Sequence, residues 1–324
     1  NVSRSALQND GFVKKIADYI TKKVADKLSG MCKTEKESYE KYWDDISPFI
    51  KFGCIRDNKF CERMNDYILF KDLDGKYLTL PEALKVNDET EEKQDTNAEG
   101  NTETSSEEAS NPTDNDSSEE TEETKKRTIF YVTDEVQQGQ YIKMFKEQGL
   151  TAFILNHNID QPFISHLEQK NEKIRFQRID ADLTEEFKEE IDADALKEDI
   201  NSLTDIFRKA LKNDKLDVKV EKLKNTEVSS MITLSEENRR MQDMMKMYNM
   251  YGMDSSMFGN SETLILNYNN TLVQYILNNK DSEHVPMMCE QLYDLAMISN
   301  KPLKPEAMSN FIKRSNDIMI LLAK

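Results

Sequence analysis

The sequence predicts a mixed α+β protein, and three observations lead to that prediction. Apolar residues recur at helical spacing through residues 10–68. Strand-like and helix-like segments then alternate between residues 128 and 178, and the end of the chain returns to apolar helices. We therefore expect a three-helix subdomain, a small βαβαβ α/β sandwich, and a largely helical C-terminal domain with a short sheet.

A chain of 324 residues is long enough for such a division, because each part can bury a core of its own. The expected parts are a helical part over 1–86, an acidic disordered insertion over 87–127, a small α/β part over 128–190, and a C-terminal domain over 191–324.

The helical part is predicted from the spacing of its apolar residues. Helices are expected over Asp10–Met31, from Thr34 to near Pro48, and around Asn58–Ile68. Thr34 with Glu37 predicts a capping box for the second helix, and Pro48 is expected to disturb that helix near its end. The pair Asp74–Gly75 lies between two apolar runs and predicts a tight turn.

The acidic insertion accounts for most of the negative charge. Asn87–Thr124 contains 15 Asp and Glu residues against one Lys; subtracting that charge of −14 from the chain's −17 leaves −3 for the rest. The segment has two alanines and no larger apolar residue, so it cannot offset the entropy lost on ordering. It is either a tolerated loop insertion between two strands or an acidic interaction arm.

The α/β part is predicted from alternating segments with short connections. Strands are expected over Thr128–Thr133, Thr151–Leu155 and Ile174–Arg178, with helices over Asp134–Gln148 and Pro162–Gln169. This order predicts a small parallel sheet with helices packed on it. Since the part has neither GxGxxG nor GxxxxGK[ST], phosphate binding is not expected, and the module looks like a scaffold.

The C-terminal part contains a methionine-rich segment, Ser235–Tyr251, after a helix over Asp194–Lys212 and a strand over Lys219–Leu223. Methionine is flexible and polarizable, which suits a surface that contacts many shapes. The alternative is a buried core or interface helix that happens to be rich in methionine.

Three apolar helices are expected at the chain end, over Tyr268–Asn278, Glu283–Ser299 and Leu303–Ala323. The last two have more apolar surface than one domain readily covers, which favours self-association as a twofold four-helix bundle. The alternative is that both helices pack only onto their own domain.

Composition argues against several classes of protein. No basic stripe appears, so a nucleic-acid partner is not expected. The four cysteines form no CxxC pair and the three histidines are scattered, which argues against a zinc site or a disulfide framework. No apolar run approaches the roughly 20 residues of a membrane span. We therefore expect a cytoplasmic protein with reduced thiols, no metal and no membrane partner.

The first segment of the chain, NVSRSALQND, places a cation, Arg4, four residues before Gln8. The other distinctive segments are VKKIADYITKKVADKL, YEKYWDDISPFIKFGC, DGKYLTL, FYVTDE and the apolar C-terminal hairpin. Through these segments, the chain resembles the heat shock protein 90 family, and in particular its bacterial, HtpG-like members. The resemblance covers nearly the whole chain outside the acidic tract. It corresponds to the latter part of the family's middle domain plus its C-terminal dimerisation domain.

The resemblance implies a role for the two polar residues of the first segment. In the family, a loop arginine contacts the γ-phosphate of ATP and a nearby glutamine supports it, and these positions match Arg4 and Gln8. A planar cation there would stabilise charge on the transferred phosphoryl group. ATP and Mg²⁺ would be bound by the family's N-terminal domain, which this sequence does not contain. No activity is therefore expected from this chain alone, whereas the full-length protein is expected to be an ATPase.

The resemblance also implies an ATP-dependent molecular chaperone of the stress response that binds unfolded or partly folded client proteins and is a homodimer. Client-binding side chains would be Met241, Met244, Met245 and Tyr248. The dimer interface would include Met288, Leu292, Leu295, Phe311, Ile312, Met319 and Leu322.

The chain departs from the family pattern at its acidic tract, which is longer and more acidic than bacterial members lead one to expect. Its end, LLAK, lacks the MEEVD-type tail of cytosolic eukaryotic members, which favours a bacterial protein and argues against partners that read that tail. The tract keeps a second hypothesis open: a non-enzymatic dimeric scaffold that presents an acidic interaction arm.

Overall fold

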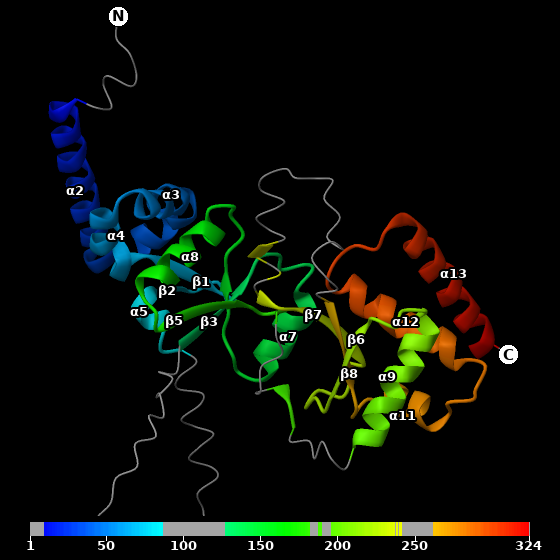
Figure 1. Cartoon of the computed structure of the whole chain (residues 1–324). Coiled ribbons are helices and arrows are strands. Elements are labelled where there is room, and N and C mark those ends of the chain that lie inside the picture. Colours follow the sequence, from blue (N-terminus) through cyan, green and yellow to red (C-terminus); the bar gives the residue numbers. More distant parts are fainter. Residues whose placement is uncertain are drawn as a thin grey trace, which may run out of the picture. The chain divides into compact units, whose positions relative to one another are not determined.

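The computed structural model describes residues 10–86, 127–181, 187–189, 196–236, 238, 240–241 and 262–323 (Figure 1). Helices and strands mix through this part of the chain, so the predicted α+β class is confirmed. The chain divides into two units. One unit is Asn1–Ile129 with Pro162–Phe176, and the other is Phe130–Gln161 with Gln177–Lys324.

Unit 1 begins with helices that follow the predicted apolar spacing. They are α2 (Gly11–Thr34), α3 (Lys36–Arg56), α4 (Asn58–Met64) and the short 3₁₀ helix η1 (Asn65–Tyr67). Asp10 and Asp57 accept backbone hydrogen bonds at the first turns of α2 and α4. Tyr39 and Trp43 of α3 are buried, and the Tyr39 hydroxyl donates to the carbonyl of Tyr67 at 3.0 Å.

Two local predictions in unit 1 are wrong. Thr34 does not cap the second helix; it ends α2, and its hydroxyl donates to the Gly30 carbonyl one turn earlier. Pro48 does not end α3 either, since the helix runs on to Arg56. Burial of Ile50 and Cys54 beyond the proline offsets the hydrogen bond that Pro48 cannot donate.

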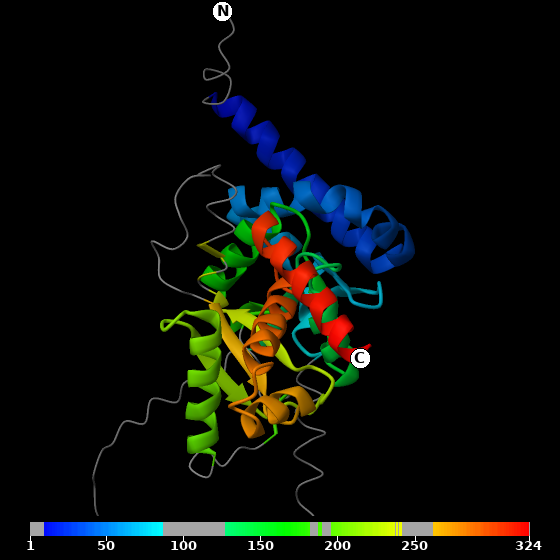
Figure 2. The same ribbon diagram turned by 90° about the vertical axis from the view of Figure 1, so that its right-hand side faces the viewer.

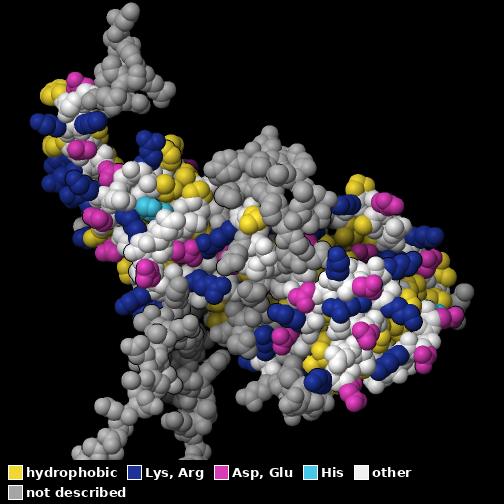
Figure 3. All heavy atoms as spheres, viewed as in Figure 1, with side chains coloured by type: hydrophobic (Ala, Val, Ile, Leu, Met, Phe, Trp, Pro, Cys, Tyr) yellow, Lys and Arg dark blue, Asp and Glu magenta, His cyan; other side chains and the backbone are white. Residues whose placement is uncertain are grey.

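The first half of α2 keeps an apolar stripe in contact with solvent. Its exposed side chains are Phe12, Ile16, Tyr19, Ile20 and Val24. Figure 3 shows hydrophobic side chains at the surface along this helix. Helical spacing therefore marks the helix correctly, but it does not show whether the apolar side is covered.

A hairpin follows the helices, as the Asp74–Gly75 pair predicts. Strands β1 (Leu69–Asp72) and β2 (Tyr77–Thr79) pair antiparallel, and Gly75 has a φ of 81°, which favours glycine. The short helix α5 (Leu80–Ala83) then begins with a capping box, in which the Thr79 N–H donates to the Glu82 carboxylate at 2.7 Å.

The predicted βαβαβ order is present. Its elements are β3 (Arg127–Val132), α7 (Gly139–Glu147), β4 (Phe153–Ile154), α8 (Asp160–Lys170) and β5 (Ile174–Arg178). β3 and β4 are parallel, with Tyr131 opposite Phe153. The strands belong to a five-stranded sheet of order β2-β1-β4-β3-β5, so the hairpin adds two strands that the sequence analysis does not assign to this sheet.

The C-terminal part of unit 2 is a three-stranded sheet with helices. The strands are β6 (Asp217–Glu221), β7 (Ser230–Leu234) and β8 (Glu262–Asn267), in the order β6-β8-β7. The helices are α9 (Lys197–Leu211), α11 (Thr271–Asn278), α12 (Val285–Ile298) and α13 (Pro305–Leu322). β8 runs parallel to β6 and antiparallel to β7.

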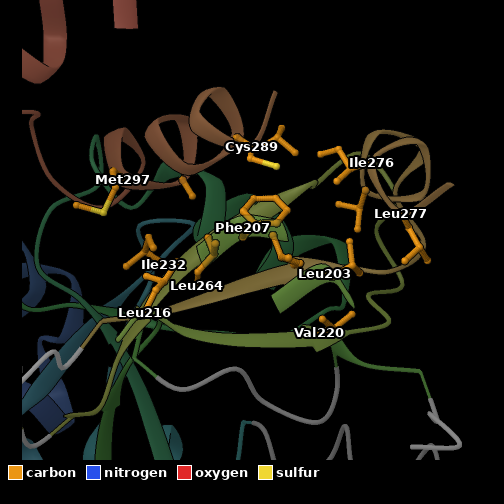
Figure 4. Close-up of a cluster of buried hydrophobic side chains, with 14 of the residues drawn as sticks. Leu203, Phe207, Leu216, Val220, Ile232, Leu264, Ile276, Leu277, Cys289 and Met297 are labelled. Carbon is orange, nitrogen blue, oxygen red and sulfur yellow. The ribbon is translucent and has the colours of Figure 1, made fainter. Parts of the chain in front are cut away.

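The core of this part lies between the sheet and the helices α9, α11 and α12 (Figure 4). Phe207 of α9 lies at its centre, with Ile232 and Leu264 from the strands and Cys289 from α12. Burying a large apolar side chain stabilises a fold by about 1.5–3 kcal/mol, so this cluster fixes the helices on the sheet. It is the support on which α13 is placed.

Candidate functional site

The final helix, α13, has apolar side chains that its own unit does not cover. Pro305 is the first residue of the helix. A backbone N–H at that position would have no intrahelical acceptor, so proline costs no hydrogen bond there. No residue of α13 is buried. The exposed fraction is 53% for Ile312, 58% for Met319 and 83% for Leu322. A helix with this much exposed apolar surface is a candidate for association.

Polar contacts of Arg314 help to hold α13 on α12. The Arg314 guanidinium donates from Nε to the Gln291 side chain at 2.9 Å and from Nη1 to Glu290 at 3.0 Å. It also hydrogen-bonds to the carboxylate of Asp294. Within unit 2, Figure 2 shows α13 lying along the outer side of α12. This joint positions the helix while Ile312, Met319 and Leu322 stay exposed.

The side chains predicted for a dimer interface differ in their exposure. Four lie on the surface of unit 2: Leu295, Ile312, Met319 and Leu322. Met288 and Phe311 are half-buried. Leu292 is only 3% exposed and belongs to the core cluster, so it can support α12 from beneath but cannot reach a partner directly.

A buried carboxylate fixes the start of the methionine-rich segment. Glu236 is 5% exposed and accepts from the Tyr131 hydroxyl at 2.7 Å. It also accepts from the backbone N–H of Arg178 at 2.9 Å and from Nε of Arg240 at 2.9 Å. The network ties the chain after β7 to β3 and β5 within unit 2. Glu236 is not predicted from the sequence; an acid two residues after an apolar strand is the signal that could have found it.

Burial and the neighbouring carboxylate of Glu236 raise the pKa of Tyr131, so its hydroxyl stays protonated and acts as a donor. The same hydroxyl accepts from Nε2 of Gln161 at 2.9 Å. Each oxygen of this network therefore has a partner, as buried polar groups require.

The structure describes only some of the other predicted site residues. Met241 is 40% exposed, which suits a contact surface. Met244, Met245 and Tyr248 lie outside the described residues, as do Arg4 and Gln8. The predicted disorder of Asn87–Thr124 also falls outside them.

The described residues show neither a cluster of metal ligands nor a helix that could span a membrane. No group of three or more His, Cys, Asp or Glu side chains there could hold a metal ion. Among the helices in those ranges, none is long and apolar enough to cross a membrane.

These features define an α+β protein with an uncovered apolar helix and a methionine-containing segment anchored by a buried carboxylate. The family model of the Hsp90 protein matches residues 1–82. Chaperone protein HtpG of Porphyromonas gingivalis is 30% identical to this chain over 94% of the chain and 41% of its own length. Chaperone protein htpG of Bacteroides fragilis is 27% identical, over 98% of the chain and 53% of its own length.

The chain belongs to the Hsp90 family, among relatives named HtpG. It spans about half the length of the curated relatives that it matches.

Proposed function

We propose that this chain is the client-binding and dimerising part of an ATP-driven chaperone of the HtpG type. The observation that carries the proposal is the similarity to HtpG chaperones, which extends over 94% of the chain at 30% identity. Such similarity includes both units, so the proposed role draws on the whole chain and not on one motif.

The geometry of unit 2 supports the two parts of this role. An apolar helix surface held in place by Arg314 suits a twofold contact with a second copy, because the same patch meets itself across the axis. Met241 is exposed and follows Arg240, which donates to the buried Glu236; it suits binding of unfolded or partly folded clients, since methionine adapts to many shapes.

Arg4 and Gln8 carry the proposed link to ATP. In the whole protein, a nucleotide-binding domain would hold ATP with Mg²⁺, and Arg4 would donate to the γ-phosphate with Gln8 in support. The planar guanidinium fits this task because it presents several donors to phosphate oxygens. A cytoplasmic location and a part in the stress response belong to the same proposal.

Client binding is tested by the aggregation of a heat-unfolded substrate protein, followed by light scattering. We expect the chain to lower the scattering, and Met241→Glu to remove much of that protection because a charge cannot be buried against apolar segments. Val136→Glu is the matched control, because Val136 is also an exposed apolar side chain of the same unit. No protection by the unaltered chain, or equal loss in both variants, would refute the client-binding role.

The ATP role is tested in the protein extended to the full length of its relatives. We expect Arg4→Ala to lower ATP turnover by about a hundredfold, as loss of one transition-state donor does elsewhere. Lys14→Ala, a change of another cation near the start of α2, should leave turnover unchanged. Unaltered turnover in Arg4→Ala would remove the assigned role without touching client binding.

A further inference from the structure

Two cysteines of unit 1 lie together where α3 meets α4. Cys54 is near the end of α3 and Cys61 is in α4; both are buried, and each thiol is within hydrogen-bonding reach of the other. Gly53 shows how closely the helices approach, because a Cβ there would lie 2.8 Å from Cε1 of the buried Phe60 ring. The corner therefore holds the two sulfurs in a fixed position.

The charges around this pair favour a thiolate at Cys61. The Cys54 thiol donates to Cys61 and lowers its pKa, and Lys170 of α8 acts in the same direction, against burial, which raises it. The pKa of Cys54 is raised, because donation to Cys61 holds its proton and because the site is buried. Of the two thiols, Cys54 is therefore the donor and Cys61 the acceptor.

A cavity of about 310 Å³ opens onto Cys61. Lys170, Leu167, Glu62 and Asp66 also line it. Its volume admits molecules the size of a few waters, and its walls have both a cation and carboxylates. Cys54 does not line the cavity, so a small reagent would meet Cys61 first.

The remaining cysteines have a different environment. Burial raises the pKa of Cys32, and burial raises that of Cys289 to about 12. Neither lines this cavity. These two thiols serve as internal controls for any measurement on Cys61.

We propose that Cys61 and Cys54 form a thiol modification site for small hydroperoxides, in which Cys61 is the attacking sulfur and Cys54 the resolving one. The proposal is independent of chaperone function, since it uses only the α3–α4 corner, its cavity and Lys170 of α8.

The reaction balances with one hydroperoxide. The Cys61 thiolate forms a bond to one peroxide oxygen as the O–O bond breaks, and the other oxygen leaves as hydroxide and takes up a proton. The Cys54 sulfur then attacks the Cys61 sulfenic acid, an S–S bond replaces the S–O bond, and the oxygen leaves as water with the proton of Cys54. Two thiols are oxidised, and hydrogen peroxide is reduced to two waters.

The test is site-resolved mass spectrometry on the unaltered chain. In the first arm, iodoacetamide is added at neutral pH, and we expect Cys61 to be alkylated at least about tenfold faster than Cys32 and Cys289. In the second arm, hydrogen peroxide is added and non-reducing peptides are mapped, and we expect a Cys54–Cys61 disulfide that dithiothreitol reverses.

Variants separate the two roles. Cys61→Ser should abolish both the fast alkylation and the disulfide, whereas Cys54→Ser should leave Cys61 to proceed to sulfinic acid; Cys289→Ser should change neither. Alkylation of Cys61 no faster than that of Cys289 would overturn the proposal. Oxidation of Cys61 in the unaltered chain without a bond to Cys54 would also overturn it. Both results come from the unaltered chain, so neither requires a variant to fold.

Discussion

At the scale of single residues, the buried network around Glu236 decides how the methionine-rich segment is joined to the rest of unit 2. One carboxylate with three hydrogen-bond donors satisfies groups from β3, β5 and the start of the segment. Because charged acceptors bind more strongly than neutral ones, this joint is expected to be rigid.

The Tyr131 hydroxyl tests this joint. Tyr131→Phe removes one donor from buried Glu236 and the acceptor of Gln161, so we expect the free energy of unfolding to fall by about 1–3 kcal/mol. Urea unfolding followed by circular dichroism measures the change. Tyr275→Phe, at a half-exposed tyrosine of α11, should be neutral, and an equal effect of the two variants would contradict the network's role.

Two glycines of unit 1 give opposite expectations for the same substitution. Gly53→Ala places a methyl group 2.8 Å from the Phe60 ring and should lower the free energy of unfolding by about 1–3 kcal/mol. Gly30→Ala, inside α2 with no atom within 4 Å, should raise it by about 0.5–1 kcal/mol, since alanine favours a helix more. Thermal unfolding would show both signs; a shift in the same direction for both would contradict the packing at the α3–α4 corner.

At the scale of elements, the capping box of α5 makes the stability of a helix start depend on pH. The backbone N–H of Thr79 donates to Glu82 and lowers the pKa of that carboxyl. A lowered pKa in the folded state means that the charged form contributes stability above the ordinary pKa, and that the contribution is lost as pH falls through the lowered value.

Glu82→Gln tests this linkage. We expect the variant to lose about 0.3–1 kcal/mol of unfolding free energy at neutral pH, where an anion at a helix start is favourable. The difference from the unaltered chain should shrink as the pH falls below the lowered pKa of Glu82. Urea unfolding from neutral to acid pH measures it, with Glu172→Gln as the control outside any cap. A difference that grows toward acid pH would refute the sign.

Prediction from sequence succeeds for the elements that local patterns define. Helical spacing identifies the helices of unit 1, and Asp74–Gly75 identifies the β1–β2 turn, because each depends on neighbouring residues. β7 and β8 are missed. Every residue of β7 is buried, so it lacks the alternation of a half-exposed strand, and β8 pairs with strands far along the chain.

In the candidate site, too, local patterns predict some features and miss those that depend on long-range packing. Exposed apolar residues of α13 are predicted from composition, but the burial of Leu292 is set by the packing of α12 against β7, which no local pattern reveals. The Cys54–Cys61 pair likewise has no CxxC spacing, and only the turn between α3 and α4 brings it together.

At the scale of the whole molecule, two hypotheses differ in what the acidic tract does. If the chain is part of a chaperone, deleting residues 87–124 should leave suppression of aggregation within about twofold, since a segment without large apolar residues contributes little to a core. A scaffold that presents an acidic arm should instead lose its partner. Light scattering of a heat-unfolded substrate measures the effect, and complete loss of protection would favour the scaffold.

We propose that the chain dimerises through the apolar surface of α13 as the base of an HtpG-type chaperone. Two exposed apolar side chains there, Met319 and Leu322, would be buried by a partner, and replacing both with lysine would place four like charges in one twofold interface.

Sedimentation velocity over a range of concentrations tests this claim most directly. We expect the unaltered chain to sediment as a dimer, the Met319→Lys/Leu322→Lys variant as a folded monomer, and Val136→Lys as a dimer. A monomer at every concentration for the unaltered chain, or a dimer that survives the double substitution, would contradict it.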